Sequence, residues 1–505
     1  MNLVKSQKMI AAETKAVERG TTFAALMEKA GSESARIIYD NYCADKKNVL
    51  IISGRGKNGG DGFVISRYLT QMNCNTLVLL PCGKPSDEIS LNNLNLLDEG
   101  TVYETDDYLN LIKYSDIIVD CLFGTGFRGS LDEKCSALAK AVNASGKTVV
   151  SIDIPSGAVC DTAEIIGEVI EADLTIAISA LKPIHIMKPA CRVCGRVAVA
   201  DIGIVDEDFE SKDGHLFFTL TDEELKEMLP FRPAVSNKGT FGNALCICGS
   251  RNMPGAAKIA AQGAMKSGAG LVSLAFPDAA YNAIAPSITE QVMLPCKSDS
   301  SGTFSAKSAN SLLERAEKCT AALIGCGIGV NEDTEELVSK IIENIRIPLV
   351  IDADALNCIA ENPEILRKAK APVVITPHPG EMSRLTGLSI SEILANPDRT
   401  AIDFSKKYSC ITVLKLANTT VSDGEDRVYI NPNGNSGLAK GGSGDLLSGI
   451  IVSLLAQGME PLDAACAGVY IHGGCADFTA RLLSERGMTV SDIITCLPSY
   501  LKKFE

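Results

Sequence analysis

Short apolar runs, glycine-rich turns and helical stretches follow one another in the same order throughout this chain, and that order limits the fold more than any other feature. Asn48–Ser53 runs into a glycine loop at residues 54–62, and Asp116–Leu122 runs into another at Gly124–Gly129, each ahead of a helical stretch. The same order returns in the second half of the chain. Parallel strands joined by helical crossovers produce this alternation. The sequence therefore predicts an α/β protein.

The length and one charged stretch indicate two domains. A single core rarely organises 505 residues, so two large domains are expected. The charge run between Glu207 and Asp213 has no apolar periodicity and is typical of a linker. We predict domains at residues 1–215 and 225–505, each a doubly wound sheet covered by helices on both faces.

The charge balance argues against two classes of partner. The formal net charge is −14 at pH 7, whereas nucleic acids and anionic membranes both require a basic face on the protein. Any phosphate ligand therefore has to be bound locally. We expect small-molecule substrates, no nucleic acid and no membrane, and we expect the chain to form a homo-oligomer.

Cysteine usage and the amino-terminal stretch point to a reducing compartment. The 18 cysteines lie within apolar runs, where reduced and buried thiols are ordinary. Cys191 and Cys194 form a C-x-x-C pair, but the second half of a zinc site is missing, so packed thiols are the preferred interpretation. The first residues lack the apolar core of a signal peptide, and no run of about 18 uncharged apolar residues occurs. These features predict a cytoplasmic protein.

A glycine-dense loop that leads into an apolar helix at Asp445 is the clearest functional feature. Gly441, Gly442 and Gly444 let a phosphate approach the unpaired N–H groups of the first helical turn. Asp445 has two interpretations. It is the N-cap of the helix, a common use of aspartate, or it is a general base that takes the proton from a hydroxyl attacking a phosphoryl group.

Three strand ends in the first half carry glycine, acidic and hydroxyl residues. Residues 54–59 and 124–129 each read G-x-G-x-x-G, and Asp153 and Ser156 follow the third strand. Because the carboxyl ends of parallel strands meet at one edge of a sheet, the three loops together predict a ligand site. Each glycine pattern alone also fits an ordinary tight turn. Lys182 follows the fourth strand and either faces the same ligand site or is a solvated surface lysine, which is the default interpretation.

Polar residues also follow the strands predicted in the second half. Asp352 and Asp354 either cap the next helix or serve a metal ion or water. His378 lies between two prolines in a rigid loop, which favours a ligand-binding role. Gly327 and Lys415–Thr419 follow two further strands.

Taken together, these stretches resemble the bifunctional NAD(P)H-hydrate repair enzymes, which fuse an NAD(P)H-hydrate epimerase to an ADP/ATP-dependent NAD(P)H-hydrate dehydratase. The resemblance covers nearly the whole chain. The matching stretches are, in chain order, ALMEKAG, GRGKNGGDG, DCLFGTGFRG, DIPSG, KGTFGNALCICGS, GAGLVSLA, GCGIG, DADAL, PHPGE and GGSGDLLSGII. The family implies a Rossmann-like epimerase half and a ribokinase-like dehydratase half, both with three layers.

The resemblance implies two sets of site residues in the first half, with Asp153 as the catalytic acid or base. The residues implied to hold the hydrated dinucleotide are Lys57, Asn58, Gly59, Gly60, Asp61, Gly124, Thr125, Gly126, Phe127, Arg128, Gly129, Ser130 and Asp153. The residues implied to coordinate K⁺ are Asn58, Asp120 and Ser156. A structural role in turns is the alternative for Asn58 and Asp120.

The resemblance implies two further sets in the second half, with Asp445 as the catalytic base. The residues implied to hold the hydrate are Ala264, Gly327, His378 and Asp445. The residues implied to hold ADP or ATP, bound with Mg²⁺, are Lys415, Leu416, Ala417, Asn418, Thr419 and Gly444.

Three positions depart from the family pattern. Lys57 replaces the first of two asparagines, and its cation is able to pair with substrate phosphates. Leu416 stands where glycine usually follows the lysine, which predicts a lower affinity for the nucleotide. Cys326 stands where proline is usual in the G-x-G-x-G loop.

The family implies repair of a cofactor that carries a hydroxyl at C6 of its nicotinamide ring. The first half epimerises the R and S forms of NADHX and NADPHX, and the second half dehydrates the S form at the expense of ADP or ATP. The alternative enzyme is a ribokinase-like small-molecule kinase fused to a nucleotide-binding domain. A non-catalytic nucleotide-binding protein is the alternative of a different class.

Overall fold

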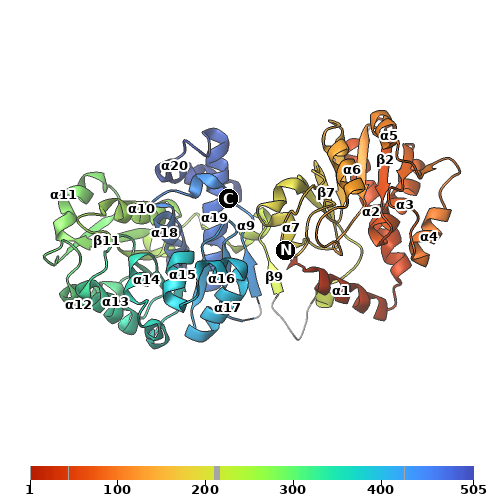
Figure 1. Cartoon of the computed structure of the whole chain (residues 1–505). Coiled ribbons are helices and arrows are strands. Elements are labelled where there is room, and N and C mark those ends of the chain that lie inside the picture. The colour runs from red at the N-terminus through yellow and green to blue at the C-terminus, as the bar shows by residue number, and fades with distance from the viewer. Residues whose placement is uncertain (1, 44, 210–215, 426) are drawn as a thin grey trace. The chain divides into compact units, whose positions relative to one another are not determined.

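The computed structural model describes residues 2–43, 45–209, 216–425 and 427–505. Its internal contacts divide the chain into two compact units, Met1–Leu216 and Phe217–Glu505 (Figure 1). Phe218 and Leu220 belong to the apolar core of the second unit, so that unit begins before the predicted start at residue 225.

The predicted linker between Glu207 and Asp213 is wrong in its first part. Helix α8 (Asp206–Phe209) occupies it, Asp208 and Phe209 are buried, and Asp208 pairs with Arg19 of the same unit. Although this charge run has no apolar periodicity, its first part is folded, because the Asp208 carboxylate forms an ion pair with Arg19 of the same unit. The rest of the predicted linker, from residue 210 onward, lies outside the described residues.

The first unit is an α/β unit with a parallel sheet. Its helices and strands are β1 (Asn2–Leu3), α1 (Ser6–Glu18), α2 (Phe23–Tyr42), β2 (Asn48–Ser53), α3 (Lys57–Gln71), β3 (Asn75–Leu79), α4 (Glu88–Asn95), β4 (Val102–Tyr103), α5 (Tyr108–Tyr114), β5 (Ile117–Cys121), α6 (Glu133–Asn143), β6 (Thr148–Ile152), β7 (Leu174–Ile178), α7 (Pro183–Ile186), β8 (Arg196–Ala200) and α8. The strand order is β4-β3-β2-β5-β6-β7-β8, and every neighbouring pair is parallel.

Alternation along β2 shows how the two faces of this sheet are covered. Val49 and Ile51 pack into a core with residues of α1, α2 and α3, whereas Leu50 and Ile52 pack into a core with residues of α5 and α6. Side chains on a strand alternate between faces, so a strand that is apolar at every position needs helices on both sides. The predicted three-layer arrangement is confirmed for this unit.

The order of the strands places a switch point between β2 and β5. From β2 the chain moves outward to β3 and β4, and it then returns to β5 on the opposite side of β2. The loops that leave β2 and β5 therefore diverge at the carboxyl edge of the sheet. Open α/β sheets bind their ligands in the crevice formed at such a point.

The second unit is larger and has the same kind of architecture. After β9 (Leu216–Phe218) at the division, its elements are α9 (Asp222–Met228), β10 (Asn243–Ile247), α10 (Pro254–Lys266), β11 (Leu271–Pro277), α11 (Tyr281–Ile284), β12 (Val292–Cys296), α12 (Ala309–Ala316), β13 (Ala321–Ile324), α13 (Glu332–Asn344), β14 (Leu349–Ile351), α14 (Asp354–Cys358), β15 (Val373–Ile375), α15 (Pro379–Thr386), α16 (Ile390–Ala395), α17 (Pro397–Tyr408), β16 (Ile411–Leu414), β17 (Thr420–Ser422), β18 (Arg427–Ile430), α18 (Ser443–Ala456), α19 (Pro461–Leu482) and α20 (Val490–Leu501). Short 3-10 turns join several of them.

The sheet of the second unit is mixed, not wholly parallel as predicted. Strands β12-β11-β10-β13-β14-β15-β16 are parallel in that order, but β17 and β18 continue the sheet antiparallel. The connection from β16 to β17 is the turn Lys415–Thr419, which is too short for a helical crossover. A chain that turns back so soon has to pair antiparallel.

Helices cover both faces of this second sheet. One core contains residues of α10, α18, α19 and α20, and the other contains residues of α12, α13, α15 and α17. Helix α18 is buried along nearly its whole length, and a Cβ on Gly449 would lie 2.3 Å from the Ala260 carbonyl oxygen of α10. Glycine at this position therefore lets α18 pack closely on α10, which fixes the place of Asp445. The predicted fold class is confirmed for both units.

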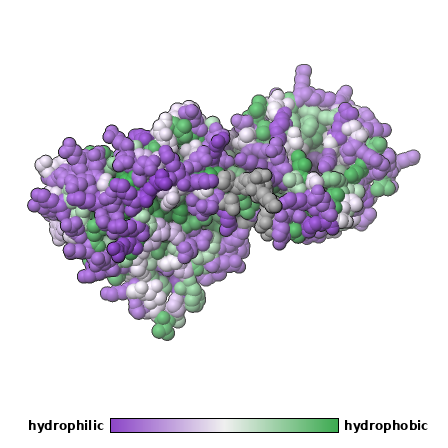
Figure 2. All heavy atoms as spheres, turned by 90° about the horizontal axis from the view of Figure 1, so that it is seen from below, coloured by the Kyte–Doolittle hydropathy of each residue, from purple (hydrophilic) through white to green (hydrophobic). Residues whose placement is uncertain are grey.

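The visible surface is mostly hydrophilic (Figure 2). Hydrophilic side chains cover most of the face shown in Figure 2, and apolar side chains are scattered between them in small groups. Among the described residues, no helix combines the length and the apolar character needed to cross a membrane.

Candidate active sites

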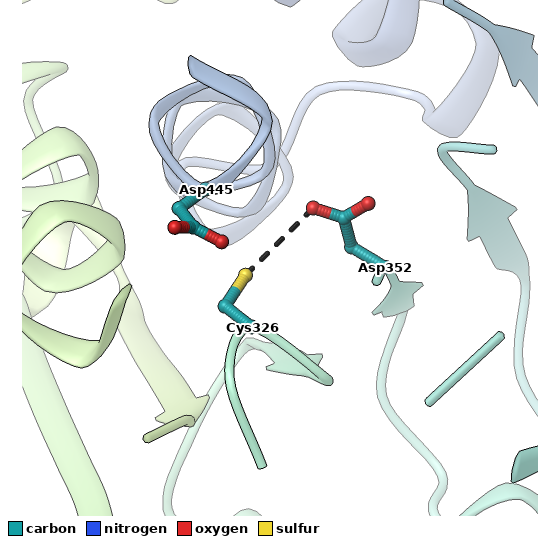
Figure 3. Close-up of side chains that lie close together, drawn as sticks. All are labelled: Cys326, Asp352 and Asp445. Carbon is teal, nitrogen blue, oxygen red and sulfur yellow. Dashed lines mark hydrogen bonds between the residues drawn. The ribbon is translucent and has the colours of Figure 1, made fainter. Parts of the chain in front are cut away.

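Three side chains from separate segments meet beneath the start of α18 in the second unit. Asp445 lies in the first turn of α18, Asp352 follows β14, and Cys326 lies in the glycine loop after β13 (Figure 3). One ligand atom of each lies within 4.8 Å of the other two. The Cys326 thiol donates to Asp352 Oδ2 over 3.8 Å.

Asp445 is not the cap of its helix. Gly442 occupies the N-cap position of α18 with a left-handed φ of 93°, and no side chain caps the helix there. Since φ values of this sign suit glycine, the Gly441–Gly442 pair turns the chain without help from Asp445. The capping interpretation is therefore wrong, and the carboxylate of Asp445 is free to face the cluster.

The two aspartates of the cluster differ in their pKa values. Burial raises the pKa of Asp445 to about 6, and the neighbouring Asp352 carboxylate adds to the rise. Burial also opposes ionisation of Asp352, but the Lys415 ammonium and the Ser448 hydroxyl outweigh it and lower the pKa of Asp352. Asp352 is thus a fixed negative charge, whereas Asp445 exchanges a proton near neutral pH. A general base requires this kind of pKa.

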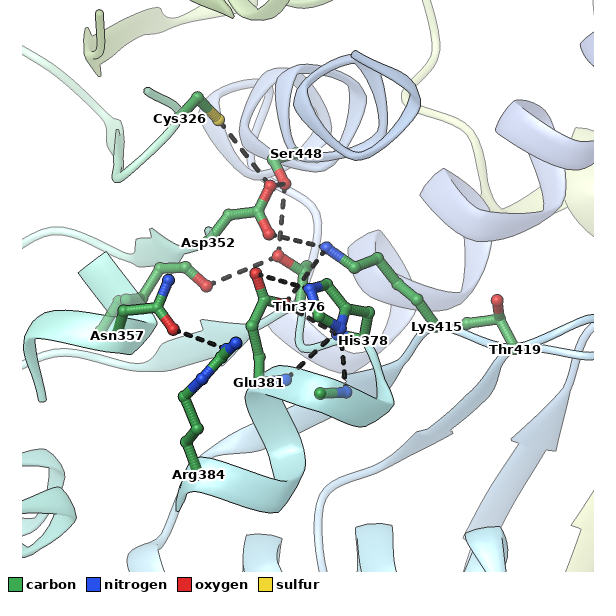
Figure 4. Close-up of polar contacts among 12 residues, drawn as sticks. Cys326, Asp352, Asn357, Thr376, His378, Glu381, Arg384, Lys415, Thr419 and Ser448 are labelled. Atoms are coloured by element: carbon green, nitrogen blue, oxygen red, sulfur yellow. Dashed lines mark hydrogen bonds and ion pairs between the residues drawn. The ribbon is translucent and has the colours of Figure 1, made fainter. Parts of the chain in front are cut away.

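Lys415 connects the cluster to a second acidic group (Figure 4). Its Nζ atom lies 2.9 Å from Asp352 Oδ1 and 3.8 Å from Glu381 Oε2. Ser448 of α18 donates to Asp352 Oδ2 over 2.7 Å. These bonds hold Asp352 from two sides and leave Asp445 as the side chain of the cluster without an ion pair among the described residues.

His378 and Asp354 hold local structure. Nδ1 of His378 accepts from the N–H groups of Gly380 and Glu381 at 2.9 and 3.3 Å, so the ring caps α15. Asp354 Oδ2 accepts from the Gly329 N–H at 2.8 Å and ties the glycine loop to α14. Neither Asp354 nor Asp352 caps α14, where Ala353 occupies the N-cap with no side-chain bond, so that interpretation is wrong. A ligand role for His378 stays a prediction, and its side chain is 51% exposed.

The predicted nucleotide residues lie partly together. A Cβ on Gly444 would lie 3.2 Å from Lys415 Nζ, so this glycine borders the lysine. Leu416 packs partly buried against an apolar core, and its N–H lies 3.5 Å from Thr419 Oγ1 across the turn. Ala417 is exposed at the tip, whereas the Asn418 side chain is buried and bonded to the Asn431 carbonyl.

The predicted hydrate residues are spread over different environments. Gly327 adopts a left-handed φ of 67° in the loop that carries Cys326. Ala264 has no exposed surface and lies in an apolar core of the second unit, so the structure does not bring it into the polar cluster. Its role as a substrate contact stays a prediction.

In the first unit, the glycines after β2 serve close packing. Helix α3 begins at Lys57, inside the predicted loop. A Cβ on Gly59 would lie 2.0 Å from the Gly54 carbonyl oxygen, and one on Gly54 would lie 1.9 Å from the Leu122 carbonyl oxygen. A Cβ on Gly60 would lie 2.5 Å from the Ser90 hydroxyl. These contacts press the first turn of α3 onto the end of β5.

Asn58 and Ser156 both contact the Phe123 carbonyl, and Ser156 bonds to Asp120, whereas K⁺ coordination by the three residues stays a prediction. Asn58 Nδ2 donates to the carbonyls of Phe123 and Ile152 at 2.9 and 3.1 Å, but its buried Oδ1 has no hydrogen-bond partner. The hydroxyl of Ser156 donates to Asp120 Oδ1 over 2.6 Å.

Asp120 has no free acceptor position. Its Oδ1 accepts from the Ser156 hydroxyl and the Leu122 N–H, and its Oδ2 accepts from the Ser151 hydroxyl and the Ser156 N–H. Burial raises the pKa of Asp120, and the Ser156 bonds oppose that rise. Asp120 therefore fastens the loops after β5 and β6 to each other.

Asp153 lies beside these loops with an unexpected partner. Its backbone φ is 68°, an uncommon conformation for aspartate, and its Oδ2 accepts from the Thr125 N–H over 3.2 Å. Lys182 Nζ lies 2.6 Å from Asp153 Oδ1, and no part of the lysine is exposed. The interpretation of Lys182 as a solvated surface lysine is wrong.

The remaining predicted residues of the first unit lie in two places, a small cavity beside α3 and the loop Gly124–Ser130. Lys57 extends toward Glu13 at 3.6 Å and over the Phe23 ring. Asp61, Lys57 and Glu13 line a cavity of about 80 Å³ whose other walls are mostly apolar. The loop Gly124–Ser130 lies largely at the surface, where the Arg128 guanidinium bonds to backbone carbonyls of its own loop.

Comparison with known proteins covers both units. A family model described as NAD(P)H-hydrate dehydratase matches residues 244–499, and one described as YjeF-related protein N-terminus matches residues 23–184. The bifunctional NAD(P)H-hydrate repair enzyme Nnr of Moorella thermoacetica is 34% identical over 495 residues, which cover 95% of this chain and 92% of that protein. The chain belongs to the bifunctional NAD(P)H-hydrate repair enzymes. The resemblance inferred from the motifs is confirmed.

Further relatives agree with this membership. The repair enzyme Nnr of Escherichia coli is 34% identical over 482 residues, which cover 95% of this chain and 89% of that protein. A solved structure of a hypothetic protein from Streptococcus mutans is 26% identical, with a TM-score of 0.50, and covers 57% of this chain and 99% of that chain. The match covers more than half of this NAD(P)H-hydrate repair enzyme and nearly all of that solved chain.

Sequence reasoning missed two polar residues of this NAD(P)H-hydrate repair enzyme, His185 and Ser448. His185 bonds to the Asp153 carbonyl, and Ser448 donates to Asp352 Oδ2. Ser448 carried a weak signal, because a serine three residues after Asp445 lies on the same side of α18. His185 carried none.

Proposed function

We propose that this protein repairs hydrated nicotinamide cofactors, NADHX and NADPHX. The first unit interconverts the R and S epimers, and the second unit dehydrates the S epimer to NADH or NADPH at the expense of ADP or ATP. The full-length match to bifunctional repair enzymes supports the pair of activities. The single observation that carries the dehydratase is Asp445, a helix-start carboxylate without a capping role whose pKa is about 6.

Asp445 supplies the base for the dehydratase. Hydroxide is a poor leaving group, so the C6 oxygen has to be phosphorylated before it can leave. Asp445 takes the hydroxyl proton as that oxygen attacks the terminal phosphorus of the nucleotide, and a nucleotide with one phosphate fewer departs. Loss of phosphate from C6 and of a proton from the neighbouring carbon then restores the ring double bond.

Lys415 and the α18 amides support the phosphoryl group in this proposal. Gly444 leaves room beside Lys415 Nζ, and the first N–H groups of α18 have no intrahelical acceptors. The carboxylates of Asp352 and Asp445 suit Mg²⁺, which prefers oxygen ligands and arrives with nucleotide phosphates, whereas the Cys326 thiol does not. When bound, Mg²⁺ neutralises charge on the transferring phosphoryl group.

Asp153 supplies the acid and base for epimerisation. C6 of the hydrate carries the hydroxyl and is bonded to ring nitrogen N1, so inversion requires one bond to break and re-form. Asp153 takes the hydroxyl proton as the C6–N1 electron pair moves to N1, and it then delivers that proton to N1. The resulting open-chain aldehyde rotates, and reversal of the steps closes the ring in either configuration.

The residues present fit a K⁺ ion in the first unit. The unpaired Oδ1 of Asn58 is a buried oxygen that an ion can satisfy, and the Phe123 carbonyl lies beside it. The Ser156 hydroxyl also lies 3.3 Å from the Phe123 carbonyl. If the hydroxyl donates to this carbonyl and not to Asp120, an oxygen lone pair of Asp120 and one of Ser156 become available to the ion. Such an ion ties three loops around the dinucleotide.

Product analysis tests the proposal. The purified chain is incubated with an epimeric mixture of NADHX and with ADP or ATP, while the absorbance of reduced nicotinamide is followed. Recovery of reduced cofactor from both epimers, with one phosphate released per molecule, is expected. A small-molecule kinase instead accumulates a phosphoester, and loss of only half the mixture assigns the chain a dehydratase without an epimerase.

We also propose a cytoplasmic location and a homo-oligomer. The 18 free cysteines, most of them buried, support a reducing compartment. The homo-oligomer rests on the sequence expectation alone, and light scattering on the eluting protein measures it directly.

A further inference from the structure

A lysine ammonium is sealed inside the first unit against the carboxylate of Asp153. Lys182 Nζ lies 2.6 Å from Asp153 Oδ1 and 2.6 Å from the Ile178 carbonyl oxygen, and the side chain has no exposed surface. Burying an ammonium is strongly unfavourable unless a charge and hydrogen bonds compensate it. Removal of either Lys182 or Asp153 alone would therefore leave an uncompensated buried charge.

The backbone around this pair is clamped by His185. Nδ1 of His185 accepts from the Lys182 N–H over 2.9 Å, so the ring proton is on Nε2, which donates to the Asp153 carbonyl over 2.7 Å. Burial, reinforced by the Lys182 ammonium, lowers the pKa of His185 to about 4 and keeps the ring neutral. One imidazole thus holds Asp153 and Lys182 in register, although they are 29 residues apart.

The two oxygens of Asp153 face different surroundings. Oδ1 points to Lys182, whereas Oδ2 accepts from the Thr125 N–H and lies 3.2 Å from the position of a Cβ on Gly124. Oδ2 is therefore the oxygen directed at the loop predicted to hold the dinucleotide. Lys182 stands behind the carboxylate and has no exposed atom with which to touch a ligand.

We propose that Lys182 is a positioning residue for epimerisation, which keeps Asp153 ionised and aims its Oδ2 at the Gly124–Ser130 loop. This inference rests on the proposed epimerase function of the first unit. The ammonium holds Oδ1 from behind, so a proton taken from the substrate arrives on Oδ2.

The charges around Asp153 agree with this role. The Asp153 carboxylate interacts electrostatically with Glu13 and Asp61 and helps to raise the pKa of each, after the larger effect of burial. Burial alone would raise the pKa of Asp153, but Lys182 outweighs burial and lowers the pKa below the ordinary value. The charged and titratable groups that interact electrostatically with Asp153 are Glu13 of α1, Asp61 of α3, Cys160 of the following loop, and Lys182 with His185.

Replacement of Lys182 by methionine in the full-length chain tests the proposal. Lys182→Met keeps the length of the side chain and removes the charge. We expect kcat for epimerisation to fall about 100-fold at neutral pH, with KM nearly unchanged because the lysine touches no substrate. The acidic limb of the pH profile moves upward, since Asp153 is ionised less readily. Dehydration of the S epimer by the other unit stays at the wild-type rate.

A surface lysine of the same unit provides the matched control. Lys140, 65% exposed and 3.4 Å from Glu168, loses an ion pair in Lys140→Met without touching the site. The control keeps the wild-type kcat and pH profile. If Lys182→Met also keeps both, or if it lowers the residual activity of Asp153→Asn as much as that of the wild type, Lys182 does not act through Asp153 and the proposal is overturned.

Two outcomes remain to be separated. If Lys182→Met fails to fold, the double variant Asp153→Asn/Lys182→Met is expected to fold because neither charge is left buried alone, and continued unfolding assigns the lysine a structural role only. If the wild type does not epimerise, the proposed epimerase function fails. NMR titration of Asp153 then tests separately whether Lys182 keeps this carboxylate ionised. That part of the proposal stands only if the pKa of Asp153 is higher in Lys182→Met than in the wild type.

Discussion

Lys415 places its ammonium 2.9 Å from Asp352 Oδ1, whereas Asp445, in the same cluster, forms no such ion pair among the described residues. One cation therefore separates the behaviour of two neighbouring carboxylates. The pKa of Asp352 is lowered because Lys415 and Ser448 outweigh burial, and the pKa of Asp445 is raised by burial and by Asp352 itself. Pairs of acids whose pKa values are driven apart are a common arrangement in acid–base catalysis.

Asp445→Asn is expected to abolish dehydration while nucleotide binding stays largely intact. The amide keeps the shape of the side chain but cannot accept the hydroxyl proton, so kcat falls by about 10³. Steady-state kinetics with S-NADHX give kcat, and equilibrium binding of ADP gives the affinity. Turnover at the wild-type rate would show that Asp445 has no part in proton transfer.

The pH dependence of dehydration is expected to report Asp445. The base works only when ionised, so kcat/KM falls as the pH drops through about 6, the pKa of this carboxyl. Asp352→Asn moves this limb to lower pH, because it removes a negative charge beside Asp445 and leaves the Lys415 ammonium with Glu381 as its remaining acidic partner. Cys326→Ala moves it to higher pH, because the neighbouring thiol, whose presence favours the Asp445 carboxylate, is lost.

The opposite directions of the two pH shifts, in Asp352→Asn and in Cys326→Ala, are the control. Both variants replace a member of the cluster, so a general loss of packing would move the acidic limb in the same direction in each. A limb that stays in place in both variants contradicts the assignment of Asp445 as the titrating base.

Many of the strands were accessible from the sequence, because apolar runs such as Asn48–Ser53 coincide with observed strands such as β2. The role of the glycines was not. Gly59 was expected to help hold the dinucleotide, but a Cβ there would lie 2.0 Å from the Gly54 carbonyl oxygen, so packing alone requires glycine. A sequence pattern cannot distinguish a glycine needed for close packing from one needed for ligand approach.

Charged partners far apart in the chain were also beyond the sequence. Lys182 is buried only because Asp153, 29 residues earlier, and the Ile178 carbonyl reach it. A lysine after a strand is solvated in most proteins, so the pattern favoured the wrong interpretation. By contrast, the five residues between β16 and β17 carried a usable signal for an antiparallel pair, since no crossover fits that length.

Asp445→Asn is also expected to stabilise the second unit, and only at higher pH. The ordinary pKa is 3.8 and the folded value is about 6, so below pH 3.8 the carboxyl is protonated in both states. Between about pH 4 and 6 the unfolded chain ionises first, and above pH 6 the native state keeps a buried charge. The variant gains about 1–3 kcal/mol at pH 8 and almost nothing below pH 4. Urea unfolding of residues 217–505 at the two pH values measures the difference.

The second unit is expected to fold and work without the first. A chain of residues 217–505 contains strands β10 to β18 of its sheet, both of its cores and every member of the Asp445 cluster. It should consume only one epimer of NADHX, so half of an epimeric mixture stays unrepaired. A chain that starts at residue 225 should be less stable, because it lacks the core residues Phe218 and Leu220.

Chromatographic separation of the two epimers during the reaction checks this division of activities. The conditions have to make spontaneous epimerisation negligible, and added first unit, residues 1–216, should restore consumption of the second epimer. Equal consumption of both epimers by residues 217–505 alone contradicts the division.

Potassium is expected to accelerate epimerisation, and the reason lies in one unpaired atom. Asn58 Oδ1 is buried without a hydrogen-bond partner, which is unfavourable unless an ion or water satisfies it. Exchange of Na⁺ for K⁺ at constant ionic strength should therefore raise the epimerisation rate and leave dehydration by the second unit unchanged. Asp120→Asn, which keeps the shape of the side chain, and Asp120→Ala should both remove the difference between the salts.

The two Asp120 variants separate an ion site from simple loop support. Asp120 accepts four hydrogen bonds, so Asp120→Ala is expected to lower stability as well, whereas Asp120→Asn keeps part of the bonding. Thermal unfolding of residues 1–216 in the two salts gives a second readout, because an ion that binds only the folded unit raises its Tm. Equal epimerisation rates and equal Tm values in both salts for the unmutated protein contradict the ion site, while the assignment of Asp153 is unaffected.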